Sequence, residues 1–215
     1  MRMLPAGCQE FEYDALTGAR SVLQGRLKHV LCFLQADPEL CKLAACQTRP
    51  AHALLYYGLT PLGHDYYAGH FRGEPYRCLK NYEVAIRDDP AVGFPAAEVL
   101  DEMSRFERSV AAAIAALDAY AVSGRSRASL LIRIAQAAAV LFELFLRIHP
   151  YANGNGHIAR LIVCAVMGRY RLWPRQWSVE PRPVDWARFL EALKRQRHAG
   201  TDDLAKAFLA MAKWG

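Results

Sequence analysis

Residues 149–160, HPYANGNGHIAR, constrain the fold more than any other part of this 215-residue chain. They lie between two apolar runs with helical spacing, residues 128–148 and 161–170. Pro150 disfavours the helical conformation for the residue before it, so the first helix should end there. Two glycines within the stretch permit positive φ angles and let a ligand approach the backbone closely. The sequence therefore predicts a helix, a tight loop and a second helix.

The start of the second helix is the feature that points to chemistry. A helix that begins near residues 155–157 has N–H groups without intrahelical partners, and together with the helix dipole they favour an anion such as phosphate. His157 and Arg160 are three residues apart and share one helix face, and arginine can bind phosphate through two parallel hydrogen bonds. His149 stands at the entrance of the loop. These residues predict a site for phosphoryl or nucleotidyl transfer.

Residues 149–160 resemble the motif of the Fic family, which has the form H-P-F-x-[D/E]-G-N-G-R-x-x-R. The positions that match are His149, Pro150, Gly154, Asn155, Gly156 and Arg160, and Tyr151 conservatively replaces the phenylalanine. Two positions depart: Asn153 stands in place of the acid, and His157 in place of the first arginine. The resemblance covers roughly residues 50–212 and implies an all-α fold, a single Fic-like helical domain with a small β-hairpin flap beside the loop. Residues 1–49 would form an N-terminal helical extension.

The segment 60–94 has a different character from the rest of the chain. Its helical periodicity disappears, and two short extended runs are compatible with a β-hairpin around Lys80-Asn81. Residues 67–72, YAGHFR, also match a piece that precedes the flap in the Fic family. The resemblance places the flap roughly at Pro75–Ile86 and implies that it positions a target segment by main-chain pairing. Its candidate residues are Tyr76, Arg77, Cys78, Leu79, Lys80 and Asn81.

Apolar residues at helical spacing predict the remaining elements. Asp37 is the expected N-cap of a short helix that has proline in its first turn. The predicted helices are Leu16–Gln35, Pro38–Cys46, Pro50–Gly58, Ala96–Tyr120, Arg127–Ile148, 156–171, Pro181–Arg197 and Asp202–Lys213. We expect the strongly hydrophobic helix Arg127–Ile148 to be central and nearly enclosed. Residues 1–15 are expected to be an irregular, loosely packed lead-in.

His149 is the candidate catalytic residue. A neutral imidazole near pH 7 can accept the proton of a hydroxyl that attacks a nucleotide phosphate. The backbone amides of Gly154–Gly156 and the side-chain amide of Asn155 would stabilise the charge on the transferred phosphate. Arg160 and His157 would contact further phosphate groups, and Tyr151 should pack beneath the loop. The structural alternatives are a histidine helix cap, a plain glycine turn and a solvent-facing arginine.

The two departures from the family motif leave the activity open. An acid at position 153 would bind Mg²⁺, for which the carbonyl of Asn153 is a weaker ligand, and His157 removes a permanent positive charge. The activity could be impaired, or it could be retuned to another phosphate-linked donor. A third reading has both side chains on one diphosphate, with the metal held mainly by phosphates. His149 and His157 could also share a metal, although no third ligand is evident.

We therefore expect a transferase of the Fic type. It would move AMP, or another phosphate-linked moiety, from a nucleotide donor such as ATP, with Mg²⁺ as a cofactor, to a serine, threonine or tyrosine hydroxyl of a protein. The alternative is a non-catalytic Fic-fold module that binds nucleotide or a protein segment. The family's inhibitory [S/T]-x-x-x-E-[G/N] string does not occur in either terminal region. Any restraint would then come from a separate inhibitory partner or from the altered motif itself.

The net charge of +6 could also indicate a nucleic-acid-binding protein. The arginine-rich pieces at 125–133, 169–175 and 194–197 are scattered and lack interleaved aromatics. This pattern favours solvated helix faces with some attraction for nucleotide phosphates, and nucleic acid is not the expected partner. No apolar run is expected to span a membrane, since polar residues interrupt the longest, residues 134–146.

The compartment is expected to be the cytoplasm. Residues 1–10 lack a signal-peptide pattern, so the alternative is delivery as an effector by a route that needs no such signal. Six cysteines occur without a C-x-x-C pair, and their spacing is not that of a zinc site. We expect reduced, mostly buried thiols.

Overall fold

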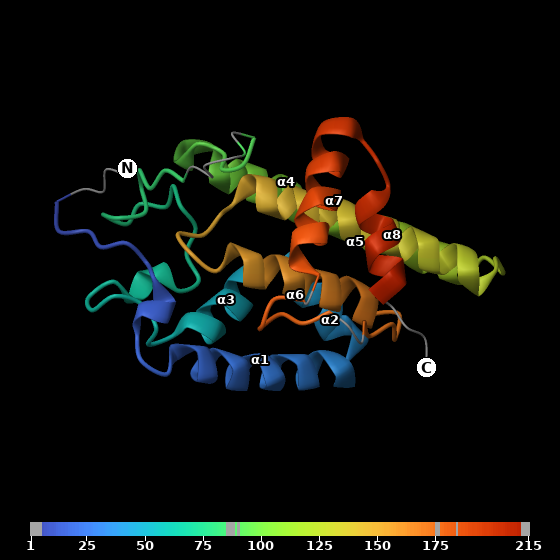
Figure 1. Cartoon of the computed structure of the whole chain (residues 1–215), viewed down its shortest axis with the longest axis horizontal. Helices are drawn as coiled ribbons and strands as arrows, with labels where there is room; N and C mark the ends of the chain where they lie inside the picture. The colour runs from blue at the N-terminus through green and yellow to red at the C-terminus, as the bar shows by residue number, and fades with distance from the viewer. Residues whose placement is uncertain (1–5, 85–88, 90, 175–176, 184, 212–215) are drawn as a thin grey trace.

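The computed structural model describes residues 6–84, 89, 91–174, 177–183 and 185–211. The helices are α1 (Ala19–Ala36), α2 (Pro38–Cys46), α3 (Thr48–Tyr56), α4 (Val99–Ala121), α5 (Arg127–Ile148), α6 (Asn155–Gly168), α7 (Trp186–Ala199) and α8 (Asp203–Met211) (Figure 1). Short 3₁₀ turns occur at Tyr13–Ala15, Asp65–Tyr67 and Ala96–Glu98. Within these ranges no residue belongs to a β-strand, so the predicted all-α class is confirmed.

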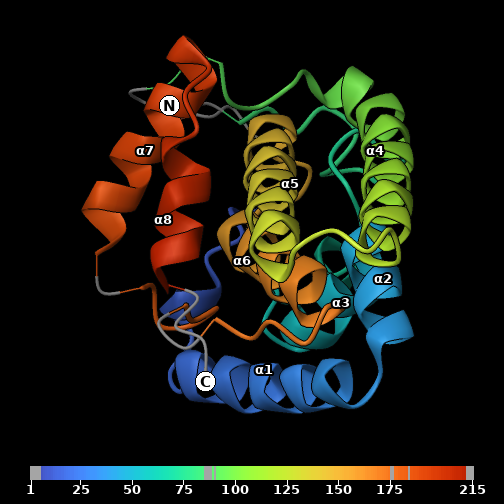
Figure 2. The same ribbon diagram turned by 90° about the vertical axis from the view of Figure 1, so that its right-hand side faces the viewer.

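Helix α5 is the centre of the bundle, as the sequence predicted, but it is not nearly enclosed: eight of its 22 residues are buried, and Ile132 and Val140 are exposed. Figure 2 shows it between α4 on one side and α8 on the other, with α6 packed against it. Ser126 caps its N-terminus by accepting a hydrogen bond from the N–H of Ser129 at 3.2 Å. The buried face of α5 consists of Ile134, Ala135, Ala138, Ala139, Leu141, Phe142, Phe145 and Ile148. Each large apolar side chain among them contributes roughly 1.5–3 kcal/mol through burial.

The length of α5 corrects one expectation. By length and composition alone this helix could cross a membrane, whereas we expected no run of sufficient length. A core helix of a soluble protein passes the same test, because it is apolar on every side that touches a neighbour. Here α4, α6 and α8 pack against α5. These contacts account for the apolar residues on the buried face of the helix, whereas Ile132 and Val140 are exposed.

Helix α6 is even more enclosed. All its residues except Gly156 are buried, and it contacts α5, α2, α3 and α1. A helix that is apolar on all sides belongs in a protein core. The loop that precedes α6 is therefore anchored between two core helices, α5 and α6, and its geometry is set by the packing of both.

The helices on the N-terminal side agree with the predicted pattern. Asp37 caps α2 by accepting a hydrogen bond from the N–H of Glu39 at 2.8 Å, and Pro38 occupies the first turn. Figure 1 shows α1 running along one edge of the molecule. Helix α2 packs against α6 and α4, so it covers the core from the side opposite α8.

The predicted β-hairpin flap is wrong for the residues that the structure describes. Residues 76–82 form successive turns in which the N–H groups of Leu79 and Lys80 both donate to the carbonyl of Tyr76, at 3.0 and 2.9 Å. Leu79 and Tyr82 are buried, so these residues of the two predicted extended runs pack against the core and do not pair as strands. Of the six candidate flap residues, Arg77, Lys80 and Asn81 are exposed, Tyr76 is half-buried, and Cys78 and Leu79 are buried. Ile86, at the end of the expected flap, lies outside the described residues.

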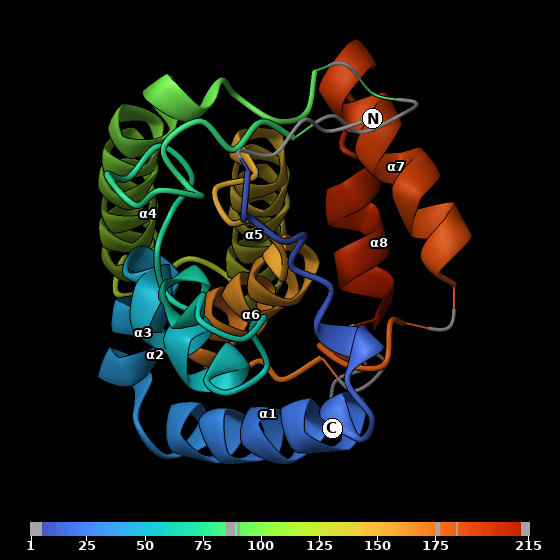
Figure 3. The same cartoon turned by 90° about the vertical axis from the view of Figure 1, so that its left-hand side faces the viewer.

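The N-terminal segment, defined here as residues 6–16, also differs from the expected loose lead-in. Figure 3 shows it running past α5 and the start of α6 before it enters α1. Phe11 is only 1% exposed, with its ring stacked on Tyr67 and edge-on to Tyr56. The hydroxyl of Tyr67 donates to the carbonyl of Gln9 at 2.9 Å. This segment is thus a packed part of the molecule.

A disulfide bond joins Cys8 to Cys78 across 70 positions of sequence. The expectation of reduced thiols is therefore wrong for this pair, while Cys32, Cys41, Cys46 and Cys164 are free. The spacing of cysteines could not reveal the bond, because it depends on the fold bringing the N-terminal segment against the turns at 76–82. Disulfides persist in oxidising surroundings and are reduced in the cytosol, so the state of this pair is informative about the protein's compartment.

Reduction of this disulfide should destabilise the protein. Cross-linking distant positions restricts the unfolded chain, and a native disulfide typically contributes about 2–4 kcal/mol. We expect Cys78→Ser to lower the thermal midpoint and to abolish its response to reductant. Cys32→Ser, which removes an exposed free thiol, is the control. Equal midpoints for the wild-type protein with and without reductant, at full reduction by mass, would contradict this assignment.

Candidate functional site

A cavity of about 730 Å³ lies where the N-terminal segment, the start of α1, the 149–154 loop, α6 and the connector after residue 177 meet. Every residue that the sequence analysis named as a candidate for catalysis, metal binding or phosphate binding lines this cavity. It is lined by Glu12, Tyr13, Asp14, Arg20, His149, Ala152, Asn153, Gly154, Asn155, Gly156, His157, Arg160, Glu180, Pro181 and Arg182. The residues before 21 and after 177 were not predicted, because no local pattern links them to the loop.

His149 is the C-cap of α5 and has a left-handed backbone, with φ 54° and ψ 58°. Such a conformation is uncommon for a residue other than glycine and is often found at functional positions. The side chain is half-buried and lines the cavity. Its Nδ1 lies 3.4 Å from the carbonyl of Leu146, an arrangement that favours the proton on Nδ1 and the lone pair on Nε2. A histidine in this tautomer can accept a proton through Nε2.

The N-terminus of α6 supplies hydrogen-bond donors to the cavity. Gly154 has φ 82°, and its carbonyl accepts from the N–H groups of His157 and Ile158. The N–H groups of Asn155 and Gly156 make no hydrogen bond to any residue that the structure describes. Two donors at a helix N-terminus, reinforced by the helix dipole, form a site suited to a phosphate oxygen.

The side chain of Asn155 does not take part in this donor group. It is 2% exposed, its Oδ1 accepts from the N–H of Tyr151 at 2.9 Å, and its Nδ2 donates to the carbonyl of Tyr151 at 2.8 Å. Both ends of the amide are thus occupied in closing the loop. The expected role of this side-chain amide in stabilising a phosphate is not supported by its position, whereas the backbone N–H of Asn155 makes no hydrogen bond to a described residue.

Asn153 is likewise occupied by internal contacts. Its Nδ2 donates to the carbonyl of Phe11, and its Oδ1 accepts from the N–H of Gly154 at 2.6 Å. No group of three histidine, cysteine, aspartate or glutamate side chains placed to hold a metal occurs among the described residues. The side chain of Asn153 is therefore engaged within the protein and is not placed as a magnesium ligand, while the carboxylates of Glu12, Asp14 and Glu180 line the same cavity.

His157 lies between two partners and makes a chain of hydrogen bonds. Its Nδ1 accepts from the Tyr56 hydroxyl at 2.7 Å, and its Nε2 donates to the Glu180 carboxylate at 2.8 Å. Burial, and secondarily the charge of Arg160, lowers the pKa of His157 to about 4 despite the opposing contact with Glu180. The imidazole is neutral at pH 7 with both nitrogens engaged. The expected phosphate contact and the alternative of a metal shared with His149 both lack support.

Arg160 fits its predicted role as a phosphate contact better than His157 does. It is 2% exposed, which excludes a solvent-facing position. Its Nε donates to the carbonyl of Val179 at 2.7 Å, and its guanidinium lies 5.2 Å from the ring centre of Trp186. The terminal nitrogens make no hydrogen bond to a described residue. Burial, followed by the charge of Arg182, lowers the pKa of Arg160 to about 10, so the guanidinium remains charged at pH 7.

A buried histidine that the sequence analysis did not single out supports the loop from beneath. His52 accepts from the N–H of Gly69 at 2.9 Å through Nδ1 and donates to the carbonyl of Asn153 at 3.0 Å through Nε2. Its ring stacks on Tyr151 at 3.7 Å, and the hydroxyl of Tyr151 is hydrogen-bonded to Thr48 at 2.8 Å. The prediction that Tyr151 packs beneath the loop is confirmed by its complete burial.

Two buried neutral histidines make stability depend on pH. Burial lowers the pKa of His52 to about 3, and His157 is lowered to about 4, whereas both have a pKa of about 6.5 in the unfolded chain. Between about pH 6.5 and these folded values only the unfolded state takes up protons, so stability falls as the pH falls. We expect a loss of at most about 2 kcal/mol per histidine near pH 5.

Urea unfolding at about pH 7.5 and pH 5 measures this loss. His52→Gln should unfold with a smaller difference between the two pH values, whatever its absolute stability. His29→Gln, at an exposed position on α1, should retain the wild-type difference. A wild-type free energy of unfolding that is the same at both pH values would refute the assignment of two buried neutral imidazoles.

Comparison with known protein families identifies a match. Residues 51–167, slightly more than half of the chain, match the model of the Fic/DOC family. The matched range runs from α3 to the end of α6 and contains the whole 149–160 stretch. No curated protein matches the chain.

Proposed function

Because the chain belongs to the Fic/DOC family, we propose that it transfers AMP, or another phosphate-linked moiety, from a nucleotide donor to a hydroxyl group of a protein. One observation carries this proposal. His149, the N–H groups at the start of α6 and the charged Arg160 all face the same cavity. A base, a phosphate cradle and a cation in one cavity are the parts that nucleotidyl transfer to a hydroxyl needs.

The proposed reaction uses these groups in order. His149 accepts the proton of a serine, threonine or tyrosine hydroxyl through Nε2 while the hydroxyl oxygen forms a bond to the α-phosphorus of the donor. The bond from that phosphorus to the departing phosphate breaks, and with ATP as donor the leaving group is pyrophosphate. The N–H groups of Asn155 and Gly156 stabilise the charge on the transferred phosphate. Arg160 binds the departing phosphates through its terminal nitrogens.

The proposed reaction relies on the chain's own donors to stabilise the phosphate charge. Asn153 is not counted among them, because its side chain is engaged by Phe11 and Gly154. Mg²⁺ is proposed only as an ion that accompanies the nucleotide, and no protein ligand is assigned to it.

A second function is favoured by the state of His157. Its two nitrogens are engaged by Tyr56 and Glu180. Within residues 149–160, Arg160 is therefore the charged side chain left to bind phosphate. With weaker charge compensation the site would bind a nucleotide or a protein segment without turning it over. This is the non-catalytic module, and it predicts binding in the absence of transfer.

One experiment separates the two functions. Cell lysate is incubated with the purified protein and each nucleoside triphosphate in turn, with Mg²⁺ present, and the proteins are analysed by mass spectrometry for adducts on hydroxyl side chains. Calorimetry with the same nucleotides measures binding. An adduct supports the transferase and identifies both the donor and the target. Binding without any adduct supports the module, and neither binding nor adduct refutes both proposals.

A further inference from the structure

We propose that Arg72 is a positioning residue that fixes the backbone of His149 and so directs its imidazole into the cavity. This inference rests on the proposed function, because it assigns His149 as the base. Arg72 lies outside the cavity and was not among the candidate site residues. It is completely buried, with 0% of its surface exposed.

The contacts of Arg72 converge on the end of α5. Its Nε donates to the carbonyl of His149 at 2.8 Å, and its Nη2 donates to the carbonyl of Ile148 at 3.1 Å. Its own backbone N–H donates to the carbonyl of Pro150 at 2.8 Å. One residue therefore holds three successive carbonyls, those immediately before, at and after the proposed base.

The same guanidinium also binds two carbonyls that belong to other parts of the chain. Its Nη1 donates to Tyr82 at 2.9 Å and its Nη2 to Phe94 at 3.0 Å. The N–H of Phe94 in turn donates to the carbonyl of Ile148 at 3.3 Å. Arg72 thus joins the turns at 76–82, the segment before α4 and the C-terminus of α5 in one polar cluster.

The physical need for such a residue arises from the helix end. The last carbonyls of α5 have no intrahelical partner and carry the negative end of the helix dipole, so a cation with several donors is favoured there. His149 is also held at φ 54°, which an L-residue adopts only where its surroundings impose it. Arg72 supplies both the charge and the directional contacts that impose this conformation.

Lysine cannot reproduce this arrangement. Its single ammonium carries a charge but has no planar fork, so it cannot hold the carbonyls of residues 148 and 149 while also reaching Tyr82 and Phe94. A displacement of a reacting group by about 1 Å can cost roughly 100-fold in rate. We therefore expect Arg72→Lys to lower kcat by roughly 100-fold. The KM for nucleotide should not change, because Arg160 and the α6 amides are held by other contacts.

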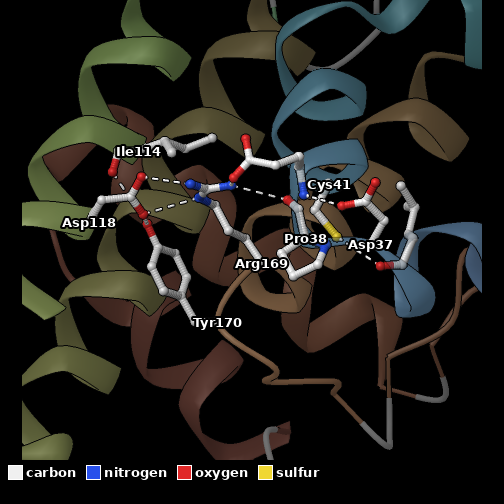
Figure 4. A network of polar contacts seen from close by, with 9 residues as sticks. Asp37, Pro38, Cys41, Ile114, Asp118, Arg169 and Tyr170 are labelled. Atoms are coloured by element: carbon white, nitrogen blue, oxygen red, sulfur yellow. Dashed lines mark hydrogen bonds and ion pairs between the residues drawn. The ribbon is translucent and has the colours of Figure 1, made fainter.

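Arg169 offers a matched control. It is largely buried and, like Arg72, makes four side-chain hydrogen bonds: two to Asp118, one to Glu39 and one to the carbonyl of Pro38 (Figure 4). It lies just beyond the C-terminal end of α6, away from the cavity. Arg169→Lys should lower the thermal midpoint, as Arg72→Lys does, but leave kcat unchanged. Equal losses of kcat in both variants would reduce Arg72 to a general structural role and overturn the proposal.

A second readout does not depend on activity. In histidine-labelled protein the ¹³Cα shift of His149 reports its left-handed backbone, and this shift should move in Arg72→Lys but not in Arg169→Lys. An unchanged shift in Arg72→Lys overturns the proposal, even if the wild-type protein transfers nothing. Loss of the proposed function alone would appear as an inactive wild-type protein in which the shift still depends on Arg72.

If Arg72→Lys is too unstable to purify, the wild-type protein provides the test. With arginine labelled on its side-chain nitrogens, the Nε proton of Arg72 should exchange with water far more slowly than that of exposed Arg105. Exchange of the Arg72 proton as fast as that of Arg105 would show that the hydrogen bond from Nε to the carbonyl of His149 is not formed, and would overturn the proposal.

Discussion

His149→Ala abolishes transfer while nucleotide binding is preserved: this is the largest effect that we expect from any single substitution. General-base catalysis typically contributes about 10²–10⁴-fold to a rate, and the transfer rate should fall by that factor when the imidazole is removed. The phosphate donors of Asn155, Gly156 and Arg160 remain, so the affinity for nucleotide measured by calorimetry should stay within about twofold.

Because His149 has a left-handed backbone, a second variant is needed. Alanine tolerates a left-handed conformation poorly, whereas asparagine adopts it more readily and has no basic nitrogen. His149→Asn should therefore be folded, should bind nucleotide and should still lack transfer. His29→Ala, on the exposed side of α1, is the control for loss of a histidine. Transfer by His149→Asn at the wild-type rate would show that another group acts as the base.

Gly154→Ala should have the largest effect on stability. Gly154 has φ 82°, and a Cβ added there would lie 2.4 Å from Cε2 of Tyr56. A left-handed alanine costs roughly 1–2 kcal/mol, and overpacking in a rigid core costs roughly 1–3 kcal/mol more. Since the Tyr56 hydroxyl donates to His157, displacement of that ring also disturbs the start of α6. We expect a loss of about 2–5 kcal/mol in urea unfolding, with weakened nucleotide binding.

Gly124→Ala separates the two contributions to this loss. Gly124 also has a positive φ, 72°, but a Cβ there would meet nothing within 4 Å. This variant should lose only the roughly 1–2 kcal/mol of backbone strain and should bind nucleotide normally. If Gly154→Ala were no less stable than Gly124→Ala, the close contact between the loop and Tyr56 would not exist in solution.

The helices of this protein could be predicted from its sequence because their stabilisation is visible in local patterns. The apolar spacing of α5 and the Asp37-Pro38 start of α2 each express a periodicity or a cap that a few neighbouring residues determine. The 149–160 stretch was informative for the same reason, since proline and glycine fix backbone geometry locally. These features located the loop, the base candidate and the buried arginine.

The contacts that decide what the motif side chains do are long-range. His157 could be recognised as a possible phosphate contact, but its partners Tyr56 and Glu180 are 101 and 23 positions away. Asn153 is likewise engaged by Phe11, which lies 142 positions away. The two extended runs around Lys80-Asn81 favoured strands, but Cys78 and Leu79 are buried against the core and form turns. Pairings of this kind follow from the fold and leave no trace in local sequence.

The N-terminal segment changes what counts as a minimal unit of this protein. The region that matches the family begins at residue 51, yet the ring of Phe11 seals Tyr56 and the carbonyl of Phe11 holds Asn153. Glu12, Tyr13 and Asp14 form one wall of the cavity. A fragment trimmed to the family boundaries would therefore lack part of the wall of this cavity. The part of this chain that matches the family is therefore smaller than the part needed to form the complete cavity.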